Sequence, residues 1–313
     1  MQFDFFRLRF HFKAVDTVRF DDGNSANTLR GAFGTVLREV ACSPQCGSAE
    51  HHPGCAYARI FEPRARHLNG PSGLADWPRP FIFRTWHLDS RTLPAGEDFH
   101  FDIHLFDLQL PMLYFVEALK RLATEGLGPR RGRARLTGIE QRDTDDRLAA
   151  RVWNGEKLSP LASPSAAHLE VEPCEAVGVR FVTPTELKCG NRPVERPEFS
   201  VLFARIRDRL STLRELYGPG PLEIDFRGMG ERAARIQMTR CDVRAERRVR
   251  RSSRTGQVHP WGGFTGEAEY QGDLAEFMPY LRVARWTGVG RQTVWGKGEI
   301  AIAGSLDPSG RAP

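Results

Sequence analysis

The chain has 313 residues, which is enough for two domains of ordinary size, each with its own hydrophobic core. Hydrophobic residues make up 40% and charged residues 27%, a balance typical of globular rather than disordered proteins. No apolar run approaches the roughly 20 residues that cross a bilayer. The opening residues, MQFDFFRLRFHFK, lack the apolar core and cleavage site of a signal peptide, so we expect a cytoplasmic protein.

The first half of the chain predicts strand, helix, strand, strand, helix and strand, in that order. The segments are 6–13, 26–41, 81–88, 99–105, 111–125 and 133–151, the last as a strand or hairpin. In the first strand, phenylalanine and leucine alternate with Arg7, Arg9, His11 and Lys13, which predicts a half-buried strand with a basic outer face. This order is that of the ferredoxin-like split βαβ unit.

The plan recurs after a segment rich in proline, serine and alanine, Ser159–Ala167, where we place the domain boundary. The second set is a strand at 177–182, a helix at 197–217, paired strands at 235–249 and 264–270, a helix at 274–283 and a strand at 299–303. The predicted fold is therefore α+β, with two tandem ferredoxin-like (RRM-like, βαββαβ) domains. We assign residues 1–160 to the first, with a Cys/His-rich loop inserted, and residues 168–305 to the second.

Positive charge is concentrated in one segment. The formal net charge is +6, and residues 232–254 alone hold nine arginines against Asp242 and Glu246. A localised cationic stripe indicates a polyanionic partner, because Arg247–Arg254 contains no acid to offset its self-repulsion. The alternative is a solvated charged turn.

Two glycine-rich loops occupy matching places in the two predicted domains. Gly288–Gly298 has four glycines with Arg291 and Lys297, and Gly126–Arg135 joins glycines to arginines. Glycine lets the backbone approach a phosphate closely, so bulky residues at Gly290 or Gly296 are expected to impair RNA binding with little loss of stability. The alternative is a flexible connection; a nucleotide P-loop is excluded because no Gly-Lys-Ser/Thr opens a helix.

The predicted nucleic-acid contacts combine the basic hairpin with these loops, which we expect to flank one groove. They are Arg130, Arg131, Arg244, Arg247, Arg248, Arg250, Arg251, Ser252, Ser253, Arg254, Gly288, Gly290, Arg291, Gln292, Gly296 and Lys297.

Three of the six cysteines crowd into one loop. Cys42, Cys46 and Cys55, with His51 or His52, could bind a structural zinc as a Cys3His set, although the spacing is not that of a standard knuckle. Local or buried thiols without metal are the alternative. The sequence has no Ser/His/Asp, HExxH or nuclease-like metal motif, so a phosphodiesterase built on it would act on RNA through the 2′-hydroxyl, without a catalytic metal or cofactor.

Several segments together resemble the CRISPR precursor-crRNA processing endoribonucleases of the RAMP superfamily. The matching segments run in the same order along nearly the whole chain: Asn27–Gly34, Cys55–Pro63, Gly126–Gly128, Phe181–Lys188, Arg251–Arg254, Gly262–Gly266 and Gly288–Gly298.

The resemblance implies tandem ferredoxin-like domains and a CRISPR repeat RNA, often a stem-loop, bound in a groove between them. It implies metal-independent cleavage in which a 2′-oxygen attacks the adjacent phosphorus, leaving a 2′,3′-cyclic phosphate and a 5′-hydroxyl. CRISPR effector-complex subunits are the protein partners that it suggests. The alternative function is a non-catalytic crRNA-binding subunit of such a complex.

The sequence departs from the family at the expected base. Many members carry a catalytic histidine in or just after the first helix, and residues 26–41 contain none. We therefore predict His51 or His52 as the base and Arg30 and Arg38 as groups that stabilise the phosphorane, with His259 and His11 in reserve. Exposed loop histidines and ordinary surface arginines are the alternative.

Overall fold

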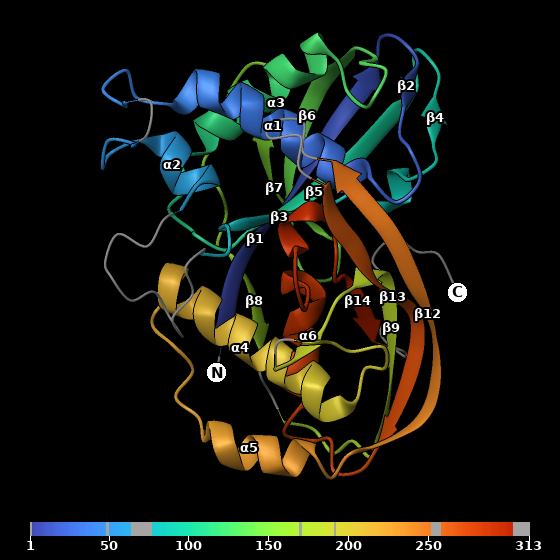
Figure 1. Cartoon of the computed structure of the whole chain (residues 1–313). Coiled ribbons are helices and arrows are strands. Elements are labelled where there is room, and N and C mark those ends of the chain that lie inside the picture. Colours follow the sequence, from blue (N-terminus) through green and yellow to red (C-terminus); the bar gives the residue numbers. More distant parts are fainter. Residues whose placement is uncertain are drawn as a thin grey trace.

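The computed structural model describes residues 2–47, 50–63, 77–168, 171–190, 192–251 and 258–302. The chain forms two halves, each an antiparallel sheet with helices against it, and strand β1 (Gln2–Ala14) extends from one half into the other (Figure 1). Among the described helices, none combines the length and apolar content that a membrane crossing needs.

The amino-terminal sheet has the order β3-β5-β1-β6-β7. Its strands are β3 (Phe81–Arg84), β5 (Asp98–Leu105), β6 (Ala134–Arg142) and β7 (Leu148–Trp153), around the central β1. Helices α1 (Ser25–Ala41) and α3 (Met112–Glu125) pack on one face of this sheet, and α2 (Ala56–Phe61) follows α1. Two short strands, β2 (Val18–Arg19) and β4 (Thr92–Leu93), pair beside it.

The carboxy-terminal sheet has the order β12-β13-β9-β14. Its strands are β9 (Ala176–Thr185), β12 (Gln237–Arg251), β13 (Val258–Gln271) and β14 (Ile300–Ile302). The helices of this half are α4 (Phe199–Tyr217), α5 (Phe226–Ala233) and α6 (Met278–Thr287), and β10 (Lys188–Cys189) pairs with β11 (Arg192–Pro193). Strand β8 (Ser165–His168), which begins in the predicted boundary segment, pairs with the first residues of β1.

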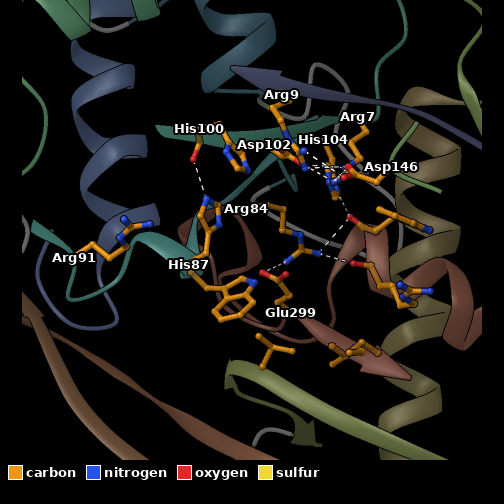
Figure 2. Close-up of a pocket in the computed structure, with 16 residues that line it drawn as sticks. Arg7, Arg9, Arg84, His87, Arg91, His100, Asp102, His104, Asp146 and Glu299 are labelled. Carbon is orange, nitrogen blue, oxygen red and sulfur yellow. Dashed lines mark hydrogen bonds and ion pairs between the residues drawn. The ribbon is translucent and has the colours of Figure 1, made fainter. Parts of the chain in front are cut away.

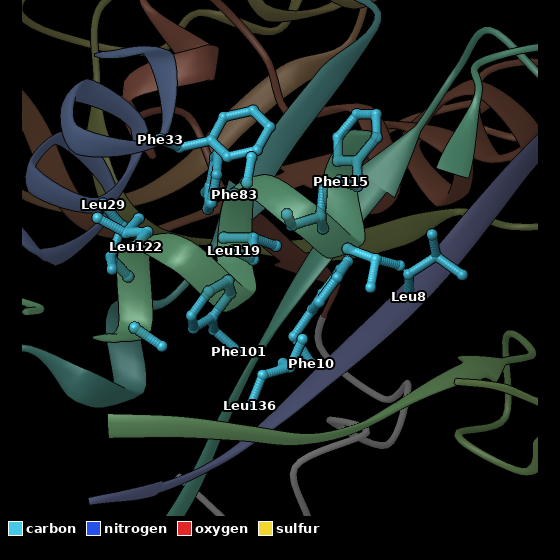
Figure 3. Close-up of a cluster of buried hydrophobic side chains, with 14 of the residues drawn as sticks. Leu8, Phe10, Leu29, Phe33, Phe83, Phe101, Phe115, Leu119, Leu122 and Leu136 are labelled. Atoms are coloured by element: carbon cyan, nitrogen blue, oxygen red, sulfur yellow. The ribbon is translucent and has the colours of Figure 1, made fainter. Parts of the chain in front are cut away.

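Each half has its own hydrophobic core. In the first, the apolar faces of α1 and α3 meet the sheet around Phe33, which stacks on Phe115 and lies edge-on to Phe83 (Figure 3). The second core lies between α4, α6 and the carboxy-terminal sheet, and it also contains Phe3 and Phe5 from the start of β1. Because one strand contributes to both cores, the two halves are joined by packing as well as by the chain.

Most predicted elements form within a few residues of their expected limits, with local differences. The strand predicted at 81–88 ends at Arg84 and becomes the 3-10 helix η2 (Trp86–Leu88), and the predicted segment 133–151 is the β6–β7 hairpin. The helix predicted at 274–283 begins later, at Met278. The short helices α2 and α5 were not predicted.

The basic outer face predicted for the first strand is not fully exposed. Arg7 is only 4% exposed, because the carboxy-terminal half covers this part of the sheet and brings Trp286 over its guanidinium, 5.6 Å from the ring centroid. The alternation within one strand cannot show that the other half of the chain packs on its polar side.

Candidate functional site

Two adjoining cavities lie where the halves meet. One, of about 350 Å³, is lined by β1, β3, β5 and η2 on one side and by β9, α6 and β14 on the other (Figure 2). The other, of about 320 Å³, lies between the start of α1 and the carboxy-terminal glycine-rich loop. Trp86, Val182 and Glu299 line both, so together the cavities form one interdomain crevice.

A network of buried ion pairs occupies one wall of the first cavity. Arg7 and Arg9 both bind Asp102, at 2.8 Å each, and both reach Asp146, at 2.7 and 3.0 Å. Burial alone would raise the pKa of Asp102, but the two guanidinium groups outweigh it and hold this pKa well below its usual range. The carboxylates thus fix the two arginines against the sheet.

Donors from both halves converge on the last carbonyl groups of α6. Arg84 donates to the backbone oxygen of Arg285 at 2.9 Å, and Nδ1 of His104 donates to that of Trp286 at 2.9 Å. Arg209, on α4, donates to that of Thr287 at 2.9 Å. These contacts satisfy carbonyl groups that have no partner within the helix, and cations suit the negative end of its dipole. The carboxyl end of α6 therefore ties the two halves together.

The carboxy-terminal glycine-rich loop is held by Glu186, which follows β9. Arg291 pairs with the carboxylate at 2.8 Å, and the ammonium group of Lys297 lies 3.4 Å from it. Lys297 is 1% exposed and also donates to Gln292, at 2.8 Å, and to the backbone oxygen of Gly262. The structure thus directs Lys297 into the protein, whereas the sequence suggested a surface cation facing a phosphate.

Glycine in this loop has a structural role that the sequence did not reveal. Gly290 has φ of 80°, and a Cβ there would lie 2.4 Å from the backbone oxygen of Glu186. Gly296 has φ of 83°, and a Cβ there would lie 2.3 Å from Cβ of Ala26 on α1. Side chains at either position would be strained and crowded, so the expectation that substitution leaves stability nearly intact is wrong.

The basic segment lies on an extended β-hairpin. Strands β12 and β13 pair from Gln237–Gln271 out to Arg251–Val258, whereas β9 pairs with β13 only from Phe264 onward, so the hairpin extends beyond the sheet (Figure 1). Arg247, Arg248, Arg250 and Arg251 lie on this extension of β12, and Arg244 is exposed. Ser252, Ser253 and Arg254 lie outside the described residues. Glu246 and Thr265, nearer the sheet, line the crevice.

The first glycine-rich loop lies elsewhere. Arg130 and Arg131 are exposed in a turn closed by pairing of Leu127 with Gly132. This turn lines a hollow with α1 and α3 that shares no lining residue with the two interdomain cavities. The expectation that both glycine-rich loops flank the same groove is therefore not met by these cavities.

The cysteine loop gathers ligand atoms of four side chains, Cys42, Cys46, His51 and Cys55, within 4.8 Å of one another. Nδ1 of His51 lies 3.6 Å from Sγ of Cys42, 3.4 Å from that of Cys46 and 3.6 Å from that of Cys55. The Sγ atoms of Cys42 and Cys55 are 4.0 Å apart. Zinc bonded to sulfur at about 2.3 Å and to nitrogen at about 2.0 Å would separate its ligands by roughly 3.6–3.8 Å, so these residues fit a zinc ion.

The groups around this cluster support the same fit. Nε2 of His51 lies 3.6 Å from a carboxylate oxygen of Glu62, an arrangement that orients metal-bound histidines, and the hydroxyl group of Tyr57 donates to Glu62 at 3.1 Å. The backbone N–H of His52 donates to Sγ of Cys46 at 3.3 Å. The sequence allowed either histidine as a ligand, and the structure selects His51.

The residues predicted to be catalytic lie around α1 and α2. The guanidinium of Arg30 lies 4.4 Å from the ring centroid of Phe61. The guanidinium of Arg38 lies 6.0 Å from the ring centroid of Tyr57. His51 is in the cysteine cluster, and His52 is exposed, with Nδ1 accepting from the backbone N–H of Gly54. None of the four lines either interdomain cavity. Their catalytic roles stay predictions.

Comparison with known families gives two matches that together span most of the chain. A family model described as an N-terminal domain matches residues 3–166, and that of the CRISPR-associated endoribonuclease Cas6 matches residues 179–300. Residues 179–300 of the chain belong to the family of CRISPR-associated Cas6 endoribonucleases. The resemblance inferred from the sequence is thus confirmed. No curated protein sequence matches the chain.

Solved Cas6 structures share the fold at low sequence identity. A Cas6 product complex is 20% identical, with a TM-score of 0.56, over 96% of this chain and 99% of that one. Thermus thermophilus Cas6 is 18% identical, with a TM-score of 0.53, over 96% of this chain and 98% of that one. Another Cas6 product complex is 18% identical, with a TM-score of 0.51, over 96% and 99%. These likenesses establish a mixed α/β fold with antiparallel sheets, like those of Cas6 structures.

The sequence analysis indicated Gly296 and Lys297 of the second cavity but missed several residues that line the first. His87, His100 and Arg84 come from segments read only as strands or their ends, and they meet only because β3 and β5 are adjacent and the second half closes over them. The alternation of His100, Asp102 and His104 on one strand face was the one available signal.

Proposed function

We propose that the chain binds CRISPR repeat RNA and cleaves precursor crRNA into mature crRNA. The observation that carries this proposal is the match of residues 179–300 to the Cas6 endoribonuclease family. The likeness of the whole fold to Cas6 complexes with RNA product supports it. We also propose that other CRISPR proteins are binding partners of this chain, since one similar structure is part of a Cas6-RT-Cas1–Cas2 complex.

The proposed architecture is two tandem ferredoxin-like domains, residues 1–160 and 168–305. In the order of the chain, β1, β3, β5 and β6 are the four strands of one such unit, and β9, β12, β13 and β14 are those of the other. Both sheets have the order second, third, first, fourth strand, which is the order that a split βαβ unit produces.

The proposed RNA-binding surface combines the extended hairpin, the carboxy-terminal glycine-rich loop and the exposed Arg130 and Arg131. Arginine contacts to phosphate position an RNA without reading its sequence. Glu246 and Thr265 of the hairpin strands line the same cavity as Gly296, which supports a continuous surface from the hairpin to the loop.

The proposed reaction needs no catalytic metal. A base removes the proton of a ribose 2′-hydroxyl, the 2′-oxygen attacks the adjacent phosphorus, and the bond to the 5′-oxygen breaks. The products are a 2′,3′-cyclic phosphate and a 5′-hydroxyl. Zinc, when bound by Cys42, Cys46, His51 and Cys55, would hold the loop between α1 and α2 in shape. A zinc-bound His51 cannot act as the base, which leaves His52 of that pair.

The test uses the whole protein with its own repeat RNA, labelled at one end, in buffer with EDTA and no magnesium. We expect one major cut within the repeat and a 2′,3′-cyclic phosphate on the upstream product. RNA binding in the same buffer checks that EDTA has not disabled the protein by removing structural zinc. Binding without cleavage would instead support the non-catalytic crRNA-binding subunit.

A further inference from the structure

The larger interdomain cavity contains a histidine that neither the sequence nor the predicted site used. His87 lies on η2 and is half-buried, and its ring stacks on that of His100, with centroids 5.0 Å apart. Its Nε2 lies 2.8 Å from the backbone oxygen of His100 (Figure 2). The fold therefore holds the imidazole in one orientation at the wall of the cavity.

This hydrogen bond fixes the tautomer. A carbonyl oxygen can only accept, so the proton of a neutral His87 is on Nε2 and the lone pair is on Nδ1. Among the described residues, nothing donates a hydrogen bond to Nδ1 of His87. Nδ1 is thus a proton acceptor that the protein itself leaves unused. His100 and His104 are poorer bases, because burial, together with Arg9 and Arg84 respectively, lowers their pKa to about 4 and about 3.

The cavity around His87 suits a nucleotide of RNA. Its volume of about 350 Å³ is within the usual range of ligand sites. Five arginines and three carboxylates line it, so positive groups outnumber negative ones in the lining, and Arg91 also pairs with Glu97 at 2.7 Å. Among the lining arginines that form ion pairs, Arg91 is the most accessible, with 45% of its side chain exposed. Trp86 offers an aromatic ring on which a base can stack.

We propose that this cavity takes the nucleotide at the cleavage site and that Nδ1 of His87 is the base that accepts the proton of its 2′-hydroxyl. The O–H bond breaks as the 2′-oxygen bonds to phosphorus, and the P–O5′ bond then breaks. The departing 5′-oxygen takes a proton from water, and the protonated His87 neutralises the hydroxide that remains. Arg91 contacts the phosphate. The inference rests on the proposed endoribonuclease function and names His87, rather than His52, as the base.

The most direct test is single-turnover cleavage by a His87→Gln protein. Glutamine can place an amide N–H near the position of Nε2, so it keeps the bond to the oxygen of His100 but provides no base at Nδ1. We expect near wild-type melting and near wild-type affinity for a repeat RNA with a 2′-deoxy nucleotide at the cut. We expect the cleavage rate to fall by about 100-fold or more. Arg227→Ala, which changes a side chain 91% exposed on α5, is the control and should cleave at the wild-type rate.

Each outcome decides between the proposals. If the wild-type protein cleaves and His87→Gln cleaves equally fast, the His87 assignment is overturned and the proposed function stands; slow cleavage by His52→Ala would then identify His52 as the base. If the wild-type protein cleaves no repeat RNA, the proposed function itself has failed. If His87→Gln does not fold, the same measurements are made on Arg91→Ala, which changes an exposed arginine that lines the cavity. A wild-type rate and affinity in Arg91→Ala would overturn the placement of RNA in this cavity.

Discussion

The guanidinium of Arg84 donates to the backbone oxygen of Arg285 at 2.9 Å while its other terminal nitrogen pairs with Glu299 at 3.2 Å. One buried side chain from β3 thereby joins the last turn of α6 and the residue before β14. The two halves of the chain are thus joined by a cation at a helix end, at the wall of the proposed reaction cavity.

Loss of this cation should be costly. We expect Arg84→Met to lower the free energy of unfolding by about 3–5 kcal/mol, because it removes the buried guanidinium from the half-buried carboxylate of Glu299 and from the backbone oxygen of Arg285. Adding Glu299→Gln should restore part of the loss. Chemical denaturation measures both, with the exposed Arg147→Ala as control. Equal stability of Arg84→Met and wild type would contradict the role of Arg84 in joining the two halves.

His104 should make stability depend on pH. Its folded pKa is lowered to about 3 by burial and by Arg84, so below about pH 6.5 the unfolded chain binds a proton that the folded one does not. The free energy of unfolding therefore decreases as the pH is lowered, by up to about 1.4 kcal/mol per pH unit. In His104→Asn, which keeps a donor near Nδ1, we expect the fall between pH 6.5 and 4.5 to be smaller by about 2–3 kcal/mol. Parallel pH profiles of the two proteins would refute this role.

The cysteine cluster should hold one zinc ion. Protein purified without a histidine tag should contain about one zinc per chain by elemental analysis, and Cys46→Ser should lower that content and the melting temperature. Cys189→Ser, an exposed thiol outside the cluster, should change neither. Zinc content that is low in the wild type and unaffected by Cys46→Ser would reject the site.

Glycine substitution separates backbone strain from helix propensity. Gly290→Ala should lower the free energy of unfolding by roughly 1–3 kcal/mol, because its φ is positive and its Cβ would meet the oxygen of Glu186. Gly31→Ala, on α1 with open space around it, should raise stability by about 0.5–1 kcal/mol. If denaturation ranks the two the other way, the loop does not have the described conformation.

RNA affinity should depend on the arginines of the hairpin. Changing Arg247, Arg248, Arg250 and Arg251 together to alanine should weaken binding and flatten its dependence on salt. Each lost phosphate contact lowers the log–log slope by up to about 0.9 on a duplex. An unchanged slope in the quadruple variant would show that the hairpin does not contact the RNA backbone.

The sequence predicted those features that depend on local pattern. The periodicity of the helix at 26–41 and the alternation in the first strand placed both elements close to their observed limits, and the crowding of cysteines in one loop indicated the Cys/His cluster that the structure contains. Features that depend on the packing of the two halves could not be predicted. Arg7 is buried only because Trp286 covers it, and Lys297 turns inward only because Glu186 lies beside the loop.

The proposed cleavage of the chain's own CRISPR repeat RNA through the 2′-hydroxyl can be tested with one modified substrate. The repeat RNA is made with a single 2′-deoxy nucleotide at the cleavage position and compared with the unmodified RNA in EDTA under single-turnover conditions. We expect equal binding of both RNAs and cleavage of the unmodified RNA only. Cleavage of the 2′-deoxy RNA at the same position, or failure to cleave either one while binding both, would contradict it.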